Sequence, residues 1–93
     1  MKCLAISKEI QPVDWSALRI ILADEARILH NLFLDGQIRE FYFTDEDEAV
    51  LILECTSKDA ARELLQQLPL VQQGLIKFEV MELKPYSGFS RLF

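Results

Sequence analysis

The chain has 93 residues, and its 15 Asp and Glu side chains outnumber its 10 Lys and Arg side chains, for a formal net charge of −5. A hydrophobic fraction of 51% excludes a disordered chain, and two cysteines are too few for a disulfide scaffold. No apolar run reaches the about 20 residues of a membrane helix, and the acidic balance argues against nucleic-acid binding, which needs clustered cations. One small domain remains, and its size favours association with further copies of itself.

The first residues, Met1 to Glu9, predict a strand over 2–7. Their apolar stretch is too short for a secretion signal and charged residues follow at once, so we expect a cytoplasmic protein. Cys3 and Cys55 are then expected to stay reduced. Neither stands in a CxxC motif or a Cys/His cluster, so we expect no zinc site and interpret both as small strand residues.

The middle of the chain predicts alternating helices and strands. Asp14 is expected to cap a helix from Trp15 to about Leu34, which Gly36 ends. The elements expected after it are a strand over 37–44, a charged turn at 45–48, a strand over 49–55, a helix over 58–68 that Thr56 or Ser57 caps and Pro69 closes, and a strand over 75–83. This β-α-β-β-α-β order predicts an α+β, ferredoxin-like fold, in which two helices cover one face of an antiparallel four-stranded sheet. We expect this domain over 1–84, followed by a tail over 85–93.

The strands are apolar on both of their faces. Two of them place the following residues on opposite faces: Leu51 and Leu53 against Val50 and Ile52, and Ile38 and Tyr42 against Phe41 and Phe43. A sheet with one face in water should instead alternate between apolar and polar residues. The pattern therefore predicts that a second copy packs on the uncovered face and forms a dimeric α/β barrel.

Glu25 interrupts the apolar stripe of the first helix. At about 100° per residue it falls within the arc of the stripe residues Leu18, Ile21, Leu22, Ile28, Leu29, Leu32 and Phe33. Burial would raise the pKa of this carboxyl group, so that it exchanges protons near neutral pH, as proton abstraction next to a carbonyl requires. Alternatively, Glu25 reaches the edge of the stripe or forms an internal ion pair. Arg39 is the natural partner in either case.

The remaining polar residues leave two interpretations each. Arg39 either holds a substrate carboxylate or is a surface charge on its strand. His30, the only histidine, lies at the margin of the stripe. It cannot build a metal site alone, although Asp or Glu could assist, and the alternative is a half-exposed helix residue without a role. The acidic run Asp45–Glu48 lacks the ligand spacing of a calcium loop. No phosphate-binding glycine motif occurs, so nucleotide chemistry is not expected.

Several short segments together resemble the muconolactone isomerase family. They are Ala23-Asp24-Glu25, Gly36 followed by Arg39, Ala61 to Leu65, Gln67-Leu68-Pro69-Leu70 and Lys84-Pro85-Tyr86-Ser87. This family consists of small ferredoxin-like proteins in the dimeric α/β barrel superfamily, which also holds YciI-like proteins. The resemblance implies a barrel-forming dimer, often in larger rings, and a cofactor-independent proton shift in an unsaturated lactone. Glu25 and Arg39 match the family pattern by position. The chain departs from it with Tyr42-Phe43 in place of a Trp-Arg pair, Arg27 in place of a second acid and Lys84 in place of a histidine.

The leading hypothesis is a cofactor-free isomerase without a metal, with its site between the first helix and the sheet or in the barrel mouth. Glu25 would carry the proton, Arg39 would anchor an anion, and Tyr42 and His30 would donate secondary hydrogen bonds to the substrate. The alternatives are a non-catalytic dimeric barrel that binds a small ligand or serves as an assembly module, and a cofactor-free monooxygenase of the same superfamily. The aromatic tail is expected to dock over the opening, on its own domain or on a partner copy.

Overall fold

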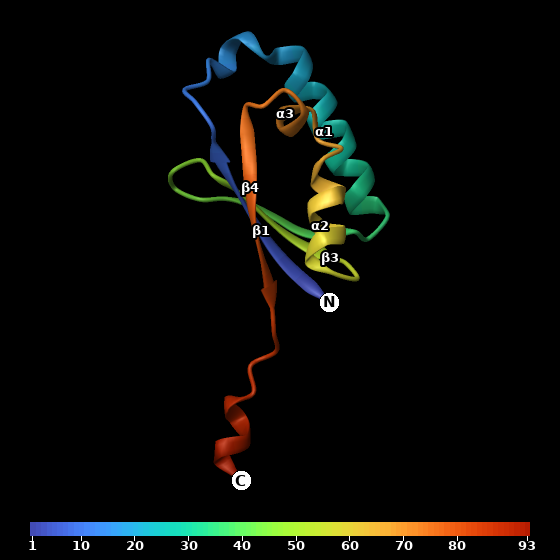
Figure 1. The fold of residues 1–93 in the computed structure, drawn as a ribbon, viewed down its shortest axis with the longest axis vertical. Helices are drawn as coiled ribbons and strands as arrows, with labels where there is room; N and C mark the ends of the chain where they lie inside the picture. Colours follow the sequence, from blue (N-terminus) through green and yellow to red (C-terminus); the bar gives the residue numbers. More distant parts are fainter.

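The computed structural model describes all residues from Met1 to Phe93, and Figure 1 shows helices stacked on one side of a single sheet. The strands are β1 (Lys2–Glu9), β2 (Ile38–Phe43), β3 (Ala49–Glu54) and β4 (Ile76–Leu83). The helices are α1 (Arg19–Leu34), α2 (Lys58–Leu65) and α3 (Pro69–Gln72), with the 3₁₀ turns η1 (Trp15–Ala17) and η2 (Gly88–Leu92). No helix is both long enough and apolar enough to cross a lipid bilayer.

The sheet has the strand order β2-β3-β1-β4, and every neighbouring pair is antiparallel. The central strand β1 places Cys3 opposite Leu53 of β3, and Ala5 opposite Val80 of β4. The helices α1 and α2 both lie on one face (Figure 1). This arrangement confirms the predicted ferredoxin-like α+β fold.

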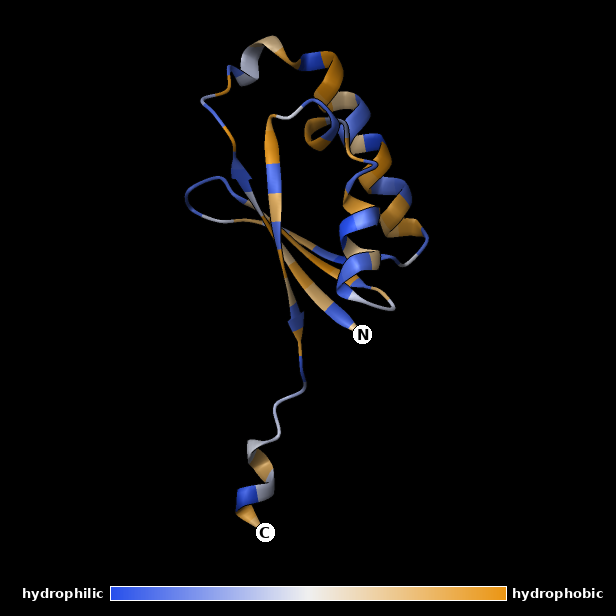
Figure 2. Ribbon diagram, in the orientation of Figure 1, coloured by the Kyte–Doolittle hydropathy of each residue, from blue (hydrophilic) through white to orange (hydrophobic).

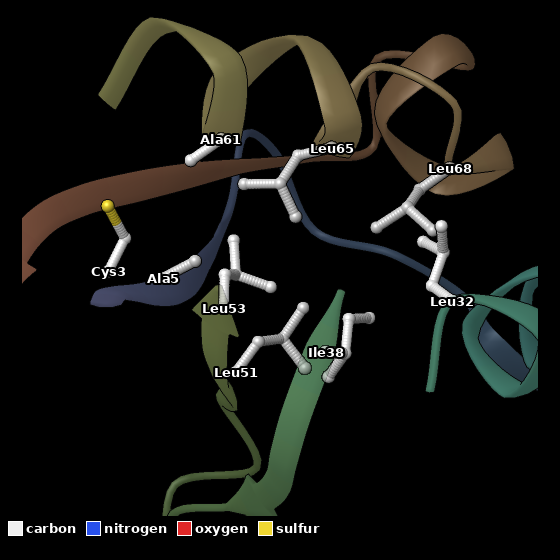
Figure 3. Packing of buried hydrophobic residues seen from close by; sticks show 9 residues of the cluster. All are labelled: Cys3, Ala5, Leu32, Ile38, Leu51, Leu53, Ala61, Leu65 and Leu68. Carbon is white, nitrogen blue, oxygen red and sulfur yellow. The ribbon is translucent and has the colours of Figure 1, made fainter. Parts of the chain in front are cut away.

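The hydrophobic core fills the space between this face and the helices (Figure 3). Its nine buried residues come from the strands β1, β2 and β3 and from the helical layer: Cys3, Ala5, Leu32, Ile38, Leu51, Leu53, Ala61, Leu65 and Leu68. The small side chains Cys3 and Ala5 let the helical layer approach the centre of the sheet closely. Cys3 is fully buried and Cys55 is half-buried, and both are free thiols. Burial also raises the pKa of the Cys55 thiol.

The start of the first helix differs from the prediction. Asp14 caps the 3₁₀ turn η1, where its side chain accepts a hydrogen bond from the backbone N–H of Ser16 at 3.2 Å. The regular helix α1 begins only at Arg19, because Leu18 leaves the helical conformation at φ −110° and ψ 27°.

The second helix is shorter than predicted and a further helix follows it. Ser57 is the cap, accepting from the N–H of Ala60 at 3.0 Å, but α2 ends at Leu65 instead of 68. Pro69 does not simply close a helix. It opens the short helix α3, where its fixed φ and missing N–H suit the first turn.

Gly36 ends α1 as predicted, with a left-handed φ of +78°. A Cβ at this position would meet no atom within 4 Å, so only the backbone conformation disfavours a side chain. We expect Gly36→Ala to lower the free energy of unfolding by about 1 kcal/mol in urea denaturation. Gly36→Asn is expected to lower it less, since Asn tolerates this conformation better. Equal losses in the two variants would contradict this explanation.

A bulge in β2 changes which residues share a face. The register shifts between Ile38 and Glu40, so that Ile38 lies opposite Leu53 on the helix-covered face. The prediction that Ile38 shares a face with Tyr42 is therefore wrong. A strand alternates with period two, and the extra residue in the bulge moves Ile38 to the other side.

The other face of the sheet carries no helix (Figure 1), although much of it is apolar. We call it the bare face, and its apolar residues are Leu4, Ile6, Tyr42, Val50, Ile52, Met81 and Leu83. Hydrophobic residues occur in every strand (Figure 2). Leu4, Ile6, Val50 and Ile52 are half-buried by their neighbours, whereas Tyr42 and Met81 are 56% and 47% exposed.

The tail over 85–93 leaves the end of β4 and points away from the domain (Figure 1). Tyr86 packs edge-on against Phe89 with a centroid distance of 4.9 Å, and this pair belongs to the tail alone. The four large apolar side chains of the tail are all exposed: Tyr86, Phe89, Leu92 and Phe93. The tail was expected to dock on its own domain or on a partner copy, and in this structure it does not dock on its own domain.

Candidate functional site

A cavity of about 1030 Å³ lies between α1 and the helix-covered face of the sheet. Its walls come from β1, α1, α3, β4 and the connection between β2 and β3. Apolar side chains such as Leu22, Leu29 and Phe78 form most of the wall. Two polar residues of the wall are buried, Ser7 at 8% and Glu25 at 7% exposure. An apolar cavity with few polar groups is the usual form of a small-molecule site.

Glu25 lies in the apolar face of α1, as its position in the stripe predicted. Its Oε1 accepts a hydrogen bond from the backbone N–H of Leu70 at 3.0 Å. Leu70 stands in the first turn of α3, where backbone N–H groups have no partner within the helix and no side chain of the cap residue serves them. Glu25 thus satisfies a backbone donor 45 positions away in the chain.

The second carboxylate oxygen of Glu25, Oε2, makes no hydrogen bond. Because no fully buried side-chain oxygen or nitrogen in the protein lacks a partner, Oε2 is not fully buried, and Glu25 lines the cavity. Burial raises the pKa of the Glu25 carboxyl group above its ordinary value of 4.5, and the Leu70 hydrogen bond offsets part of this effect. The group therefore combines access to the cavity with a shifted proton affinity.

The raised pKa of Glu25 makes the stability of the fold depend on pH. The folded state binds the Glu25 proton more tightly than the unfolded state does. Protonation of Glu25 therefore contributes fully to the free energy of unfolding below pH 4.5, and this contribution is lost as the pH rises through the raised pKa. Glu25→Gln removes the titration and keeps an oxygen for Leu70. We expect its free energy of unfolding to exceed that of the parent above the raised pKa, by about 1.4 kcal/mol for each unit of pKa shift.

Urea denaturation of both proteins over a pH series measures this difference. Asp24→Asn is the matched control, because Asp24 is the neighbouring carboxylate, is exposed and pairs with Arg27 at 2.7 Å. Its stability should follow the pH dependence of the parent. If Glu25→Gln is less stable than the parent at neutral pH, the buried charge of Glu25 does not destabilise the fold, and the explanation is wrong.

Ser7 is a cavity residue that the sequence interpretation missed. Its Oγ accepts a hydrogen bond from the N–H of Ala49 at 2.8 Å, which leaves the hydroxyl proton free to donate. The available signal was its place on β1, two residues after Ala5 and four after Cys3, on the face that the helices cover. Ser7 is a polar residue among the apolar residues of this face of β1, as Glu25 is among the apolar residues of α1.

The other predicted site residues lie outside this cavity. Arg39 is exposed at the bulge of β2 and forms no ion pair, so the expected pairing with Glu25 does not occur. Tyr42 lies on the bare face and donates a hydrogen bond to Glu40 at 2.6 Å, which raises the pKa of its phenol. His30 is exposed on α1. The single chain thus brings none of these three side chains to Glu25.

The mouth of the cavity combines aromatic and acidic side chains. Phe43 is 77% exposed there, and the indole N–H of Trp15 donates to Glu9 at 2.9 Å. We call its four acids, Glu9, Glu46, Asp47 and Glu48, the acidic rim. Glu48 pairs with Lys8 at 2.5 Å, which raises the pKa of Lys8, whereas Glu46 and Asp47 form no ion pair. No group of three or more His, Cys, Asp or Glu side chains is placed to hold a metal ion.

The fold can be compared with solved structures. No protein-family model matches the sequence, and no curated protein does. The chain is similar to the 5-chloro-2-hydroxyhydroquinone dehydrochlorinase of Burkholderia phenoliruptrix AC1100, solved with 2,5-dihydroxybenzoquinone, at a TM-score of 0.73 and 21% identity over 95% of this chain and 98% of that one. It is similar to a muconolactone isomerase at a TM-score of 0.76 and 22% identity, over 94% of this chain and 92% of that one. The expected resemblance is thereby confirmed at the level of structure: the chain has a muconolactone isomerase-like fold.

Proposed function

We propose that the protein is a cofactor-independent isomerase that shifts a proton within a small unsaturated lactone or carboxylate. The observation that carries this proposal is the Glu25 carboxylate, which is buried, has a raised pKa and presents a free oxygen to an apolar cavity. The names of the two solved neighbours support the substrate class, because both are enzymes of small oxygenated ring compounds. The fold alone does not select an activity.

In the proposed step, Glu25 acts first as a base and then as an acid. Its Oε2 takes a proton from the saturated ring carbon at the end of the conjugated double bond. The electron pair of that C–H bond moves through the ring to the lactone carbonyl oxygen. The protonated Glu25 then delivers a proton to the carbon beside the carbonyl, so that the double bond moves and no electrons are gained or lost. A raised carboxyl pKa suits both directions of transfer.

Four further residues have roles in this proposal. The free hydroxyl proton of Ser7 can donate to the lactone carbonyl oxygen, where negative charge develops in the step. Arg39 is the proposed anchor for a substrate carboxylate, with Tyr42 and His30 as secondary hydrogen-bond donors. Because these three side chains lie outside the cavity of one chain, their roles require an assembled form of the protein.

The assembled form that we propose is a homodimer in which the bare faces of two copies pack together. The half-exposed apolar side chains of that face favour removal from water, at about 25 cal/mol for each Å² of apolar surface. A second copy offers a face of the same composition, as a two-fold symmetric interface requires. Tyr42 would lie within this interface, on the opposite side of the sheet from the cavity of its own chain, so its proposed role at the substrate needs the cavity of another copy.

The proposal is tested with muconolactone as the probe, in deuterated water, by following its ring protons with NMR. We expect movement of the double bond and incorporation of solvent deuterium at the carbon beside the carbonyl, because the proton on Glu25 can exchange with solvent. The signal should disappear in Glu25→Gln and persist in Asp24→Asn. A parent protein that binds the lactone without moving the double bond would contradict the isomerase proposal for this substrate.

A non-catalytic dimeric barrel that binds a small ligand is the second candidate. The hydrogen bond from Leu70 to Glu25 favours it, since that bond shows that Glu25 already has a structural role. On this alternative, Glu25→Gln leaves the affinity for the ligand nearly unchanged and only raises stability. Titration calorimetry of both proteins with the same lactone separates the two candidates.

A further inference from the structure

The tail over 85–93 ends in a group of apolar side chains that nothing in the single chain covers. Phe89 is 65% exposed, Leu92 76% and Phe93 fully exposed. Aromatic side chains bury large areas when they find a partner, and an isolated apolar group of this size marks an interaction site. The tail also carries Arg91, follows Lys84 and contains no acidic side chain.

The mouth of the cavity has the complementary character. Phe43 presents an exposed aromatic surface, and both Phe43 and Trp15 line the cavity. On the acidic rim, Glu46 and Asp47 form no ion pair, whereas Glu48 pairs with Lys8. An apolar, basic segment therefore matches an apolar, acidic mouth in both respects.

The tail leaves the sheet at the end that is remote from its own cavity. Ile76, the first residue of β4, lines the cavity, whereas the last, Leu83, pairs with Lys2 at the opposite end of β1. The eight residues of β4 span about 25 Å at about 3.3 Å each. From there the tail continues away from the domain (Figure 1).

We infer that the tail of one copy covers the cavity mouth of a second copy, with its aromatic side chains on Phe43 and Trp15 and Arg91 facing the acidic rim. The inference rests on the proposed function in taking this cavity as the ligand site, but it does not depend on proton transfer. The partner's tail excludes water from the space around Glu25. The site is then complete only in the assembly, because a neighbouring chain supplies its cover.

Trp15 provides the readout, because it is the only tryptophan and lies at the mouth. Acrylamide quenching of its fluorescence measures how well it is covered. In the full-length variant Phe89→Ser/Leu92→Ser/Phe93→Ser, we expect the quenching constant to rise at least about twofold, as the aromatic cover is lost. The substituted side chains lie outside the core, and circular dichroism with thermal unfolding checks that the domain stays folded.

A mixing experiment shows which copy supplies the cover. The triple tail variant is mixed with an excess of Trp15→Phe, which has an intact tail but no tryptophan signal, and the two are left to exchange subunits. We expect the quenching constant to return to the parent value. A loss of cover that this partner does not restore would show that the tail covers its own cavity, and would overturn the inference. An unchanged quenching constant in the triple variant would overturn it as well.

A charge exchange tests the acidic rim separately. Arg91→Glu is expected to increase quenching at low salt, and the combination with Glu46→Lys to return it toward the parent value, since attraction between opposite charges is restored. If neither change alters the quenching, the attraction between Arg91 and the acidic rim is excluded. None of these measurements follows turnover. If Trp15 is covered but the protein leaves the lactone unchanged, the isomerase proposal is refuted and the inference about the tail still stands.

Discussion

Glu25→Gln is expected to reduce the isomerisation of an unsaturated lactone about 1,000-fold, within the range that a positioned acid or base contributes. The amide keeps an oxygen for the N–H of Leu70 but can neither take nor return a proton. We expect kcat to fall while KM changes little, because the substitution preserves the shape of the cavity. Steady-state kinetics of the parent and the variant measure both constants.

The pH dependence of the parent gives a second check. The base form of Glu25 is the charged form, and burial raises the pKa of this group from 4.5. Activity should therefore rise with pH through the raised pKa rather than through 4.5. Asp24→Asn should show the same profile, because Asp24 is exposed and bound to Arg27 on the outer side of α1. A Glu25→Gln variant with the activity and profile of the parent would exclude Glu25 as the proton carrier.

Ile52→Asp is expected to weaken the proposed dimer at least about 100-fold, because it would place a carboxylate without a partner in a desolvated interface. Ile52 lies near the centre of the bare face, opposite Leu4 of β1 and Glu40 of β2. Sedimentation equilibrium over a concentration series measures the dissociation constant. The parent should sediment as a dimer, or as a multiple of it, at concentrations where the variant is a monomer.

Ile20→Asp is the matched control, since Ile20 is 79% exposed on α1, and the same change there leaves the bare face intact. Its mass in solution should equal that of the parent. Equal masses for all three proteins would contradict an interface on the bare face. An effect of Ile20→Asp alone would place the contact between copies on α1 instead.

Glu25 shows which features of the site follow from the sequence and which only from the tertiary structure. The periodicity of the first helix predicts its burial, because the angular position of a residue on a helix depends only on its place in the chain. The partner of Glu25 does not follow from the sequence in this way. Leu70 belongs to α3, where the sequence predicts no helix because Pro69 is expected to close the one before it, and a backbone N–H carries no signature in a side chain.

Arg39 was the expected partner because its strand begins just after α1 ends. Nearness in the chain is a poor guide to contact between side chains here, since the bulge after Ile38 changes how β2 meets the sheet. The same bulge moved Ile38 into the core. A bulge depends on how two strands pair, so the pattern of one strand alone cannot reveal it.

The sequence by itself determined the order of the strands and main helices, the two apolar faces of the sheet and the buried carboxyl group. These features depend on local preference and on the periods of the helix and the strand, which are properties of short segments. Only the tertiary structure decided that Glu25 opens onto a cavity, that Ser7 shares it and that Arg39, Tyr42 and His30 lie outside it. A cavity exists between elements that are distant in the chain, and its shape depends on how they pack, which no single segment encodes.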